Sequence, residues 1–171
     1  MKQRCLDIHA HHVGKPVIDR INTEGAKHDV KVVKSEDGST RISVGGRLTG
    51  MPLIPPLSDE TARLKWMDEA GIDVQLLSGW MDLAGYHLPT EAGLWLSRVQ
   101  NEALAEMVAQ RPDRYAAAAM VPLQDAALAA TELRHAVQTL GHRAVQIGAR
   151  VEEEGLDAPQ FDAFWAAAQE R

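Results

Sequence analysis

The order of apolar and polar positions along the chain predicts alternating strands and helices. Leu64 and Met67 lie three apart in a helix that is expected to end at Gly71, and an apolar run at 74–78 predicts a buried strand. The predicted elements are strands at 5–12, 74–78, 115–121 and 143–147, and helices at 58–70, 91–110, 125–140 and 159–171. The third helix is expected to bury Leu133, Val137 and Leu140, and the fourth Phe161, Phe164, Trp165 and Ala168.

Four strand–helix repeats predict an α/β fold with parallel strands and right-handed crossovers. Two architectures fit this order, an open doubly wound sheet or part of an eight-stranded barrel. No glycine-rich dinucleotide fingerprint follows any strand, which weakens the nucleotide-binding form of the open sheet. Residues 29–48 predict a β-hairpin, and 50–56 a stiff connector. This insertion after the first strand is expected to lie over the carboxyl ends of the strands, where barrels build their active sites.

Composition narrows the class of protein. The 171 residues are 45% hydrophobic and 25% charged, which is typical of a globular domain. A net charge of −6 argues against nucleic-acid binding, and no apolar run approaches the ~20 residues of a membrane span. No apolar stretch follows the basic start at 1–4, so a signal peptide is not expected, and a cytoplasmic location is the default. The single Cys5 excludes an internal disulfide and is expected to be buried.

The candidate chemistry lies in the first strand. If its side chains alternate strictly, Asp7, His9 and His11 share one face, and His12 points to the other. Neutral imidazole is the commonest metal ligand, and two of them at this spacing can bind one ion. A third and a fourth ligand must then come from elsewhere in the fold. The alternatives are a strand with an ordinary polar face, or the remnant of a tag, which the interruption by Ala10 disfavours.

Several segments together resemble the amidohydrolase-related decarboxylases, the group that contains the aminocarboxymuconate-semialdehyde and resorcylate-type decarboxylases. The matching segments are Asp7–His11, Trp66–Gln75, Arg98–Glu102, Arg111–Tyr115, Val121–Asp125 and Ala144–Gly148. The resemblance implies a (β/α)8 TIM barrel of which this chain supplies about the first four βα units, with a small β-hairpin insertion after strand 1. Residues 1–171 are then the N-terminal half of one barrel domain, with the insertion at approximately 13–57.

The resemblance also implies a divalent metal, most often Zn2+, with His9 and His11 as ligands and Asp7 supporting them through hydrogen bonds. The family's other ligands and its acid–base histidine belong to later strands, so no catalytic residue is expected within this chain. Arg47 is the candidate for orienting a substrate carboxylate, with an ordinary solvated loop residue as the alternative. Trp80 and Tyr86 are candidates for lining the substrate pocket, with packing as the alternative.

The expected function is non-oxidative decarboxylation of a small aromatic or unsaturated carboxylic acid. One alternative is a metal-dependent hydrolase of a lactone or amide from the same superfamily. Another is an inactive half-barrel that needs the missing half. The two open edges of a half-barrel favour association, either as a homodimer or with the missing half. No nucleic-acid or membrane partner is expected.

Overall fold

The computed structural model describes residues 4–170. The predicted absence of a signal peptide rests on residues 1–4 and those that follow, of which 1–3 lie outside the described residues. The last helix ends at Ala168 and not at the predicted Arg171. None of the helices in the described part has the length and apolar character that a membrane span requires.

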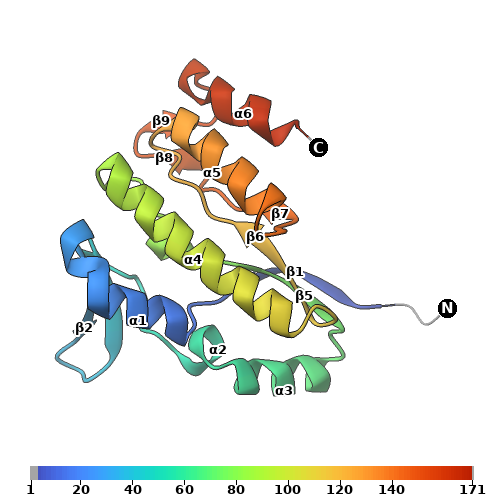
Figure 1. Ribbon diagram of the computed structural model, residues 1–171. Coiled ribbons are helices and arrows are strands. Elements are labelled where there is room, and N and C mark those ends of the chain that lie inside the picture. Colours follow the sequence, from blue (N-terminus) through green and yellow to red (C-terminus); the bar gives the residue numbers. More distant parts are fainter. Residues whose placement is uncertain (1–3, 171) are drawn as a thin grey trace.

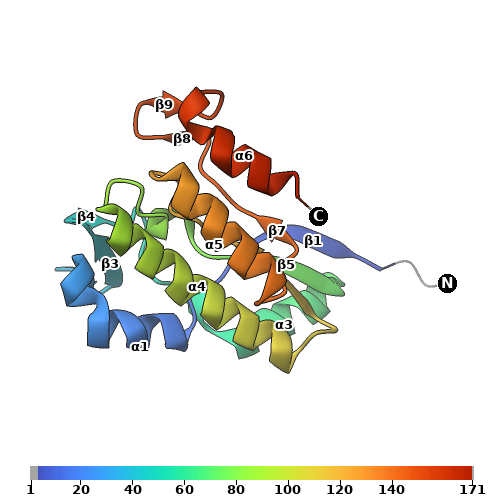
Figure 2. The same ribbon diagram turned by 45° about the horizontal axis from the view of Figure 1, so that its top comes forward.

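A parallel four-stranded sheet forms the centre of the fold (Figure 1). Its strands are β1 (Leu6–His11), β5 (Val74–Ser78), β6 (Tyr115–Ala119) and β7 (Ala144–Val145), in that spatial order. The helices α3 (Glu60–Ala70), α4 (Thr90–Gln110), α5 (Ala126–Gln138) and α6 (Asp162–Ala168) alternate with them along the chain and fan across one side of the sheet (Figure 2). This is the arrangement of a partial barrel whose helices form the outer layer.

The helix side of the sheet is packed, whereas the opposite side is open. Between the sheet and α3 and α4 lies a cluster that includes Leu77, Met67 and Leu104, none more than 2% exposed. On β1, by contrast, Leu6 and Ile8 are 56% and 69% exposed. The open side therefore corresponds to the interior of the barrel.

Local sequence signals fix the helix ends. The side chains of Asp59 and Asp125 accept hydrogen bonds from backbone N–H groups in the first turns of α3 and α5, as N-caps do. Gly71 ends α3 with φ of 69°, a left-handed conformation that glycine adopts without steric cost.

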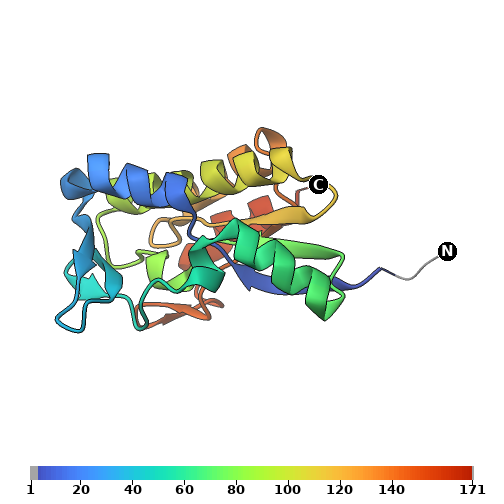
Figure 3. The same ribbon diagram turned by 90° about the horizontal axis from the view of Figure 1, so that it is seen from below.

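The insertion holds more structure than the sequence predicts. It begins with α1 (Lys15–Glu24) and a 3-10 helix (Gly25–His28), which the sequence analysis does not foresee. An antiparallel sheet follows, made of β2 (Val30–Lys34), β3 (Thr40–Val44) and β4 (Arg47–Leu48), and α2 (Pro55–Ser58) leads into α3. Figure 3 shows this insertion, in blue to cyan, gathered at the end toward which β1 runs.

Hydrogen bonds join the insertion to loops at the carboxyl ends of the strands. His87, in the loop after β5, lies 2.8 Å from the carbonyl oxygen of Val44 through its Nε2. In the same loop, Asp82 accepts a 2.6 Å hydrogen bond from the backbone N–H of Gly50. The insertion therefore lies over the strand ends, as predicted.

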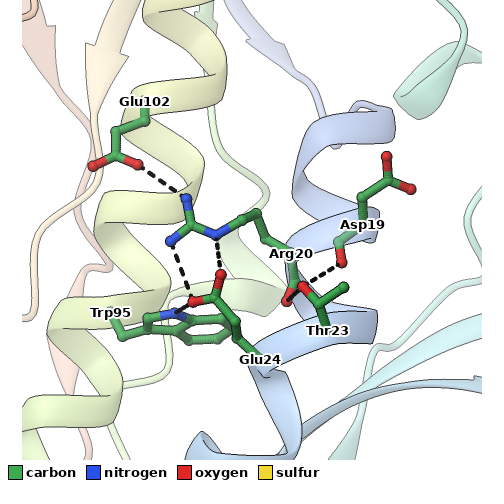
Figure 4. Close-up of polar contacts among 6 residues, drawn as sticks. All are labelled: Asp19, Arg20, Thr23, Glu24, Trp95 and Glu102. Atoms are coloured by element: carbon green, nitrogen blue, oxygen red, sulfur yellow. Dashed lines mark hydrogen bonds and ion pairs between the residues drawn. The ribbon is translucent and has the colours of Figure 1, made fainter.

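An ionic contact also holds α1 against α4 (Figure 4). The Arg20 guanidinium lies 2.8 Å from Glu24 on its own helix and 3.2 Å from Glu102 on α4. The Trp95 indole donates a 3.2 Å hydrogen bond to Glu24. These hydrogen bonds, that of Trp95 first, hold the pKa of the Glu24 carboxyl below its usual range.

Several predictions about packing are wrong. On α5, Val137 is 42% exposed because it faces a cavity between α5 and α6 and not the core. The 3-10 turn at Pro159–Phe161 shifts the phase of the last helix, so Phe161, Phe164 and Ala167 are buried every third residue. Trp165 and Ala168 are exposed as a result.

Three further differences concern the ends of strands. Cys5 is exposed, because it precedes β1 and only its backbone groups pair, with Asp73 and Val74. The fourth strand is shorter than predicted, with β7 limited to Ala144–Val145. An unpredicted hairpin of β8 (Arg150–Val151) and β9 (Glu154–Gly155) follows it.

The buried His142 gives a pH-dependent stability. Burial lowers the pKa of His142 to about 4 from an ordinary value of 6.5. Between these values the unfolded chain binds a proton that the folded chain does not, so stability falls as the pH drops from 6.5 toward 4. Chemical denaturation should show that the wild type loses about 2 kcal/mol more than His142→Leu between pH 7 and pH 5. Equal losses of unfolding free energy in the two proteins would contradict this assignment. The contribution of His12 cancels in the comparison, because both proteins contain it.

Candidate metal centre

Two imidazoles lie together at the carboxyl end of β1. The ring centroids of His9 and His11 are 5.0 Å apart, and the ring planes stand at 83° to each other. His9 is exposed on the open side of the sheet, whereas His11 is half-buried. The structure thus brings together the two side chains that the sequence predicts as metal ligands.

The surroundings of His11 fix which ring nitrogen is available. Its Nδ1 lies 2.9 Å from the carbonyl oxygen of Gly79 and 3.0 Å from the hydroxyl of Ser78. A carbonyl oxygen can only accept, so Nδ1 carries the hydrogen and Nε2 keeps a lone pair. Burial is the main cause that lowers the pKa of His11, which favours the neutral form that binds metals.

An irregularity in β1 places Asp7 differently from the simple prediction. Asp7 pairs with Gln75 and Ala10 with Leu77, so three steps along β1 match two along β5. Such a bulge interrupts the alternation of side chains that the sequence analysis assumes. The Asp7 carboxylate accepts a 2.8 Å hydrogen bond from the Gln75 amide and a 3.1 Å bond from the backbone N–H of His9. It therefore contacts the backbone of the candidate ligand His9 and a neighbouring side chain.

A buried arginine completes the network around β1. Arg63, on α3, is only 6% exposed and donates to the side-chain oxygen of Gln75 at 2.9 Å. It also donates to the carbonyl oxygens of His11 and Pro56, at 2.5 and 2.6 Å. One guanidinium thus ties the backbone of a candidate ligand to the connector before α3. The role of Arg63 was not predicted, and the one signal for it in the sequence is a glutamine inside the apolar strand β5.

A cavity of about 420 Å3 opens beside the two histidines. Its apolar wall comes from the connector and α2, through Met51, Ile54 and Leu57, from Ala62 and Trp66 on α3, and from Trp80 after β5. Its polar lining includes Asp7, His9, His11, Arg63 and Gln75. The predicted pocket residue Trp80 is among the lining side chains.

The other predicted substrate residues lie away from this cavity. Tyr86 accepts a 3.1 Å hydrogen bond from the backbone N–H of Gly148 and packs against the core under α5, and burial raises its pKa. Arg47, on β4, is 63% exposed and lies 3.4 Å from the Glu152 carboxylate in the β8–β9 hairpin. Tyr86 therefore has a packing role here, and Arg47 pairs with a carboxylate of the protein itself.

The donor set matches part of a metal site. Zinc sites in proteins use three or four side-chain ligands, and imidazole nitrogen is among the commonest. Within residues 4–170 no group of three metal-binding side chains converges. The remaining five histidines have other surroundings. His28 stacks on Trp95 at 4.3 Å, His12 and His142 are buried, His87 contacts the Val44 carbonyl oxygen, and His135 lies on α5. The described residues therefore fit two ligand positions.

Comparisons with known proteins show to which family the chain belongs. A family model described as "Amidohydrolase" matches residues 7–171. Gamma-resorcylate decarboxylase from Rhizobium radiobacter is 34% identical over 119 residues, which cover 66% of this chain and 36% of that protein. The crystal structure of 5-carboxyvanillate decarboxylase from Sphingomonas paucimobilis matches with a TM-score of 0.72 at 25% identity, covering 97% of this chain and 49% of that one.

A third match concerns the metal. Dihydroxybenzoic acid decarboxylase from a Polaromonas species, solved with manganese and the inhibitor 2-nitroresorcinol, gives a TM-score of 0.68 at 24% identity. The match covers 98% of this chain and 47% of that one. This chain spans about a third of the length of the curated relative, and about half that of the solved chains.

The role of Arg63 can be tested by replacing its guanidinium group, which donates the three hydrogen bonds. Arg63→Lys keeps the charge but cannot reach three acceptors on separate segments, so buried oxygens lose their partners. We expect a loss of about 2–3 kcal/mol in the free energy of unfolding, measured by urea denaturation. Arg111→Lys is the control, since Arg111 is half-exposed and contacts Glu60 alone through its side chain. Equal stability of Arg63→Lys and the wild type would refute the assigned role.

Proposed function

The chain belongs to the amidohydrolase family, and from that premise we propose that its residues form one side of the active site of a metal-dependent decarboxylase. The proposed substrates are small aromatic or unsaturated carboxylic acids. The observation that carries the proposal is the His9–His11 pair. The Nδ1 of His11 is held by the Gly79 carbonyl, its Nε2 is free to bind a metal, and an apolar cavity opens beside both rings.

In this proposal, residues 1–171 are the N-terminal half of one barrel domain, with the insertion at about 13–57. Further metal ligands and an acid–base histidine are supplied by strands that complete the barrel. The free edges of β1 and β7 suit this, because each has a single neighbour in the described sheet. A homodimer, or association with the rest of the barrel, would cover those edges and the exposed Leu6 and Ile8.

The proposed cofactor is a divalent metal held in part by His9 and His11. Imidazole ligands suit zinc, which stays the prediction from the sequence, whereas the Polaromonas relative holds manganese. When bound, the metal would polarise a substrate oxygen and stabilise the charge that develops there. The part played by the described residues is to hold two of its ligands in place before it arrives.

The cavity walls suit an apolar ring. Met51, Ile54 and Trp80 offer apolar surface beside the two histidines and exclude water from that side. Asp7 acts as a positioning residue, because it fixes the backbone N–H of His9. Arg47 is proposed to bind the substrate carboxylate through a charge-assisted hydrogen bond, which requires it to release Glu152 and to move toward the cavity that it does not line. The relatives reported above are decarboxylases, which favours decarboxylation over hydrolysis for this protein.

Metal retention and product analysis test this proposal. We expect His9→Ala and His11→Ala each to weaken Zn2+ and Mn2+ binding at least tenfold, measured by metal content after dialysis. Once the rest of the barrel completes it, the metal-loaded protein should release carbon dioxide from gamma-resorcylate or 5-carboxyvanillate, and both variants should lose this activity. His135→Ala is the matched control, since His135 lies on α5, away from the cavity, and should keep both properties.

Two results would contradict the proposal. One is that His135→Ala and His11→Ala lose metal equally. The other is that the metal-loaded protein opens a lactone or cleaves an amide and releases no carbon dioxide from either acid, which would assign it to the hydrolases.

A further inference from the structure

A glutamine reaches the environment of His11 from two strands away. Gln146 follows β7, and its backbone N–H donates a 2.9 Å hydrogen bond to the carbonyl oxygen of Ala119 at the end of β6. Its side-chain Oε1 nevertheless accepts a hydrogen bond from the hydroxyl of Ser78 at the end of β5. Because β6 lies between β5 and β7, the Gln146 side chain crosses over β6 to make this bond.

The composition of β6 allows this crossing. Four of its five residues are alanines, and Ala118 pairs with Ala144 of β7 directly below Gln146. The register of β5 with β6 pairs Leu77 with Ala117, which places Ser78 beside Ala118. The residue of β6 beside Ser78 is therefore an alanine, whose side chain is a single methyl group. The small side chains of the alanines at 116–119 leave space over β6 for the Gln146 side chain, although alanine favours helices.

The hydrogen bonds of His11, Ser78 and Gln146 run in one direction, from the His11 ring to the Ser78 hydroxyl and from that hydroxyl to the Gln146 side chain. Ser78 has a single hydroxyl hydrogen, and the carboxamide oxygen of Gln146 accepts it. A lone pair of the same hydroxyl then faces the Nδ1–H of His11, at 3.0 Å. Ser78 is 2% exposed, so no bulk water competes for these bonds. If Gln146 were lost, the nearest other acceptor for Ser78 would be the Ala10 carbonyl oxygen, at 3.4 Å.

We propose that Ser78 and Gln146 are positioning residues for the metal ligand His11. Gln146 orients the Ser78 hydroxyl, and Ser78 together with the Gly79 carbonyl holds the ring with Nδ1 protonated and Nε2 toward the metal. The inference rests on the proposed function, because it takes His11 as a ligand. It adds that the loop after β7 contributes to the metal site through a side chain that never touches the metal.

The test uses Ser78→Ala and Gln146→Leu in the 171-residue chain. The control is Gln124→Leu, since Gln124 is a half-buried glutamine whose amide bonds to the carbonyl oxygens of Gly85 and Leu88. Ser78→Thr keeps the hydroxyl and should restore wild-type behaviour. Thermal unfolding establishes that each variant folds, and should Gln146→Leu fail to fold, Ser78→Ala carries the test.

The first measurement is the 15N spectrum of the His11 ring in the metal-free chain at pH 8, assigned with His11→Asn. The wild type should show the Nδ1–H tautomer alone. Ser78→Ala and Gln146→Leu should show a smaller share of the Nδ1–H tautomer, because the Gly79 carbonyl alone then holds the ring. A purely structural role of these residues would not change this share. The second measurement is a Co2+ titration, in which both variants should bind about tenfold more weakly than the wild type, the control and Ser78→Thr.

Wild-type His11 signals in both Ser78→Ala and Gln146→Leu would overturn the inference. An equal change in the Gln124→Leu control would also overturn it. If neither the wild-type chain nor the barrel that the missing strands complete binds Co2+, the proposed metal site fails instead. The ring spectra then decide on their own whether Ser78 and Gln146 orient His11.

Discussion

The parallel pairing of β1 with β5 is the constraint on which the rest of the structure depends. It sets His11 beside Ser78 and Asp7 beside Gln75, so two of the polar side chains of β1 meet a polar partner on β5. The bulge between Asp7 and Ala10 is part of the same pairing. Without that extra residue, the register that joins Asp7 to Gln75 could not also join His11 to Ser78. Since a one-residue slip would separate all of these pairs, the geometry of the site and the register of the sheet are fixed together.

Much of the fold could be predicted from the sequence because its signals are local. Aspartates at 59 and 125 and a glycine at 71 mark helix ends through hydrogen bonds and backbone angles that involve only neighbouring residues. The prediction of buried side chains fails where the packing depends on an element that is distant in the sequence. Val137 fits the helical period of α5, yet α6 does not cover it, and the turn at Pro159–Phe161 rotates the face that α6 buries. The helix α1 carries only two buried apolar residues, Val17 and Ile21, so its pattern was too weak to predict.

The candidate site divides in the same way. His9 and His11 could be predicted because two imidazoles in a short strand conflict with the apolar character expected of a barrel stave. Their supporting residues could not, because Arg63, Ser78 and Gln146 come from three separate elements and acquire their roles only through tertiary contact. Tyr86 was predicted as a candidate for the pocket wall because it is an aromatic residue in the loop after β5. Its hydroxyl instead accepts a hydrogen bond from the backbone N–H of Gly148.

Hydrogen bonds on both sides of the sheet hold β1 and the proposed metal ligand His11 in place. On the helix side, Arg63 holds the carbonyl of His11 and the amide of Gln75, which in turn holds Asp7. On the interior side, Ser78 and the Gly79 carbonyl hold the His11 ring. The first set fixes the backbone of the ligand and the second its side chain, so neither can replace the other. A ligand fixed before the metal binds loses little conformational entropy on binding, which lets an otherwise exposed pair of histidines contribute to a site that further ligands complete.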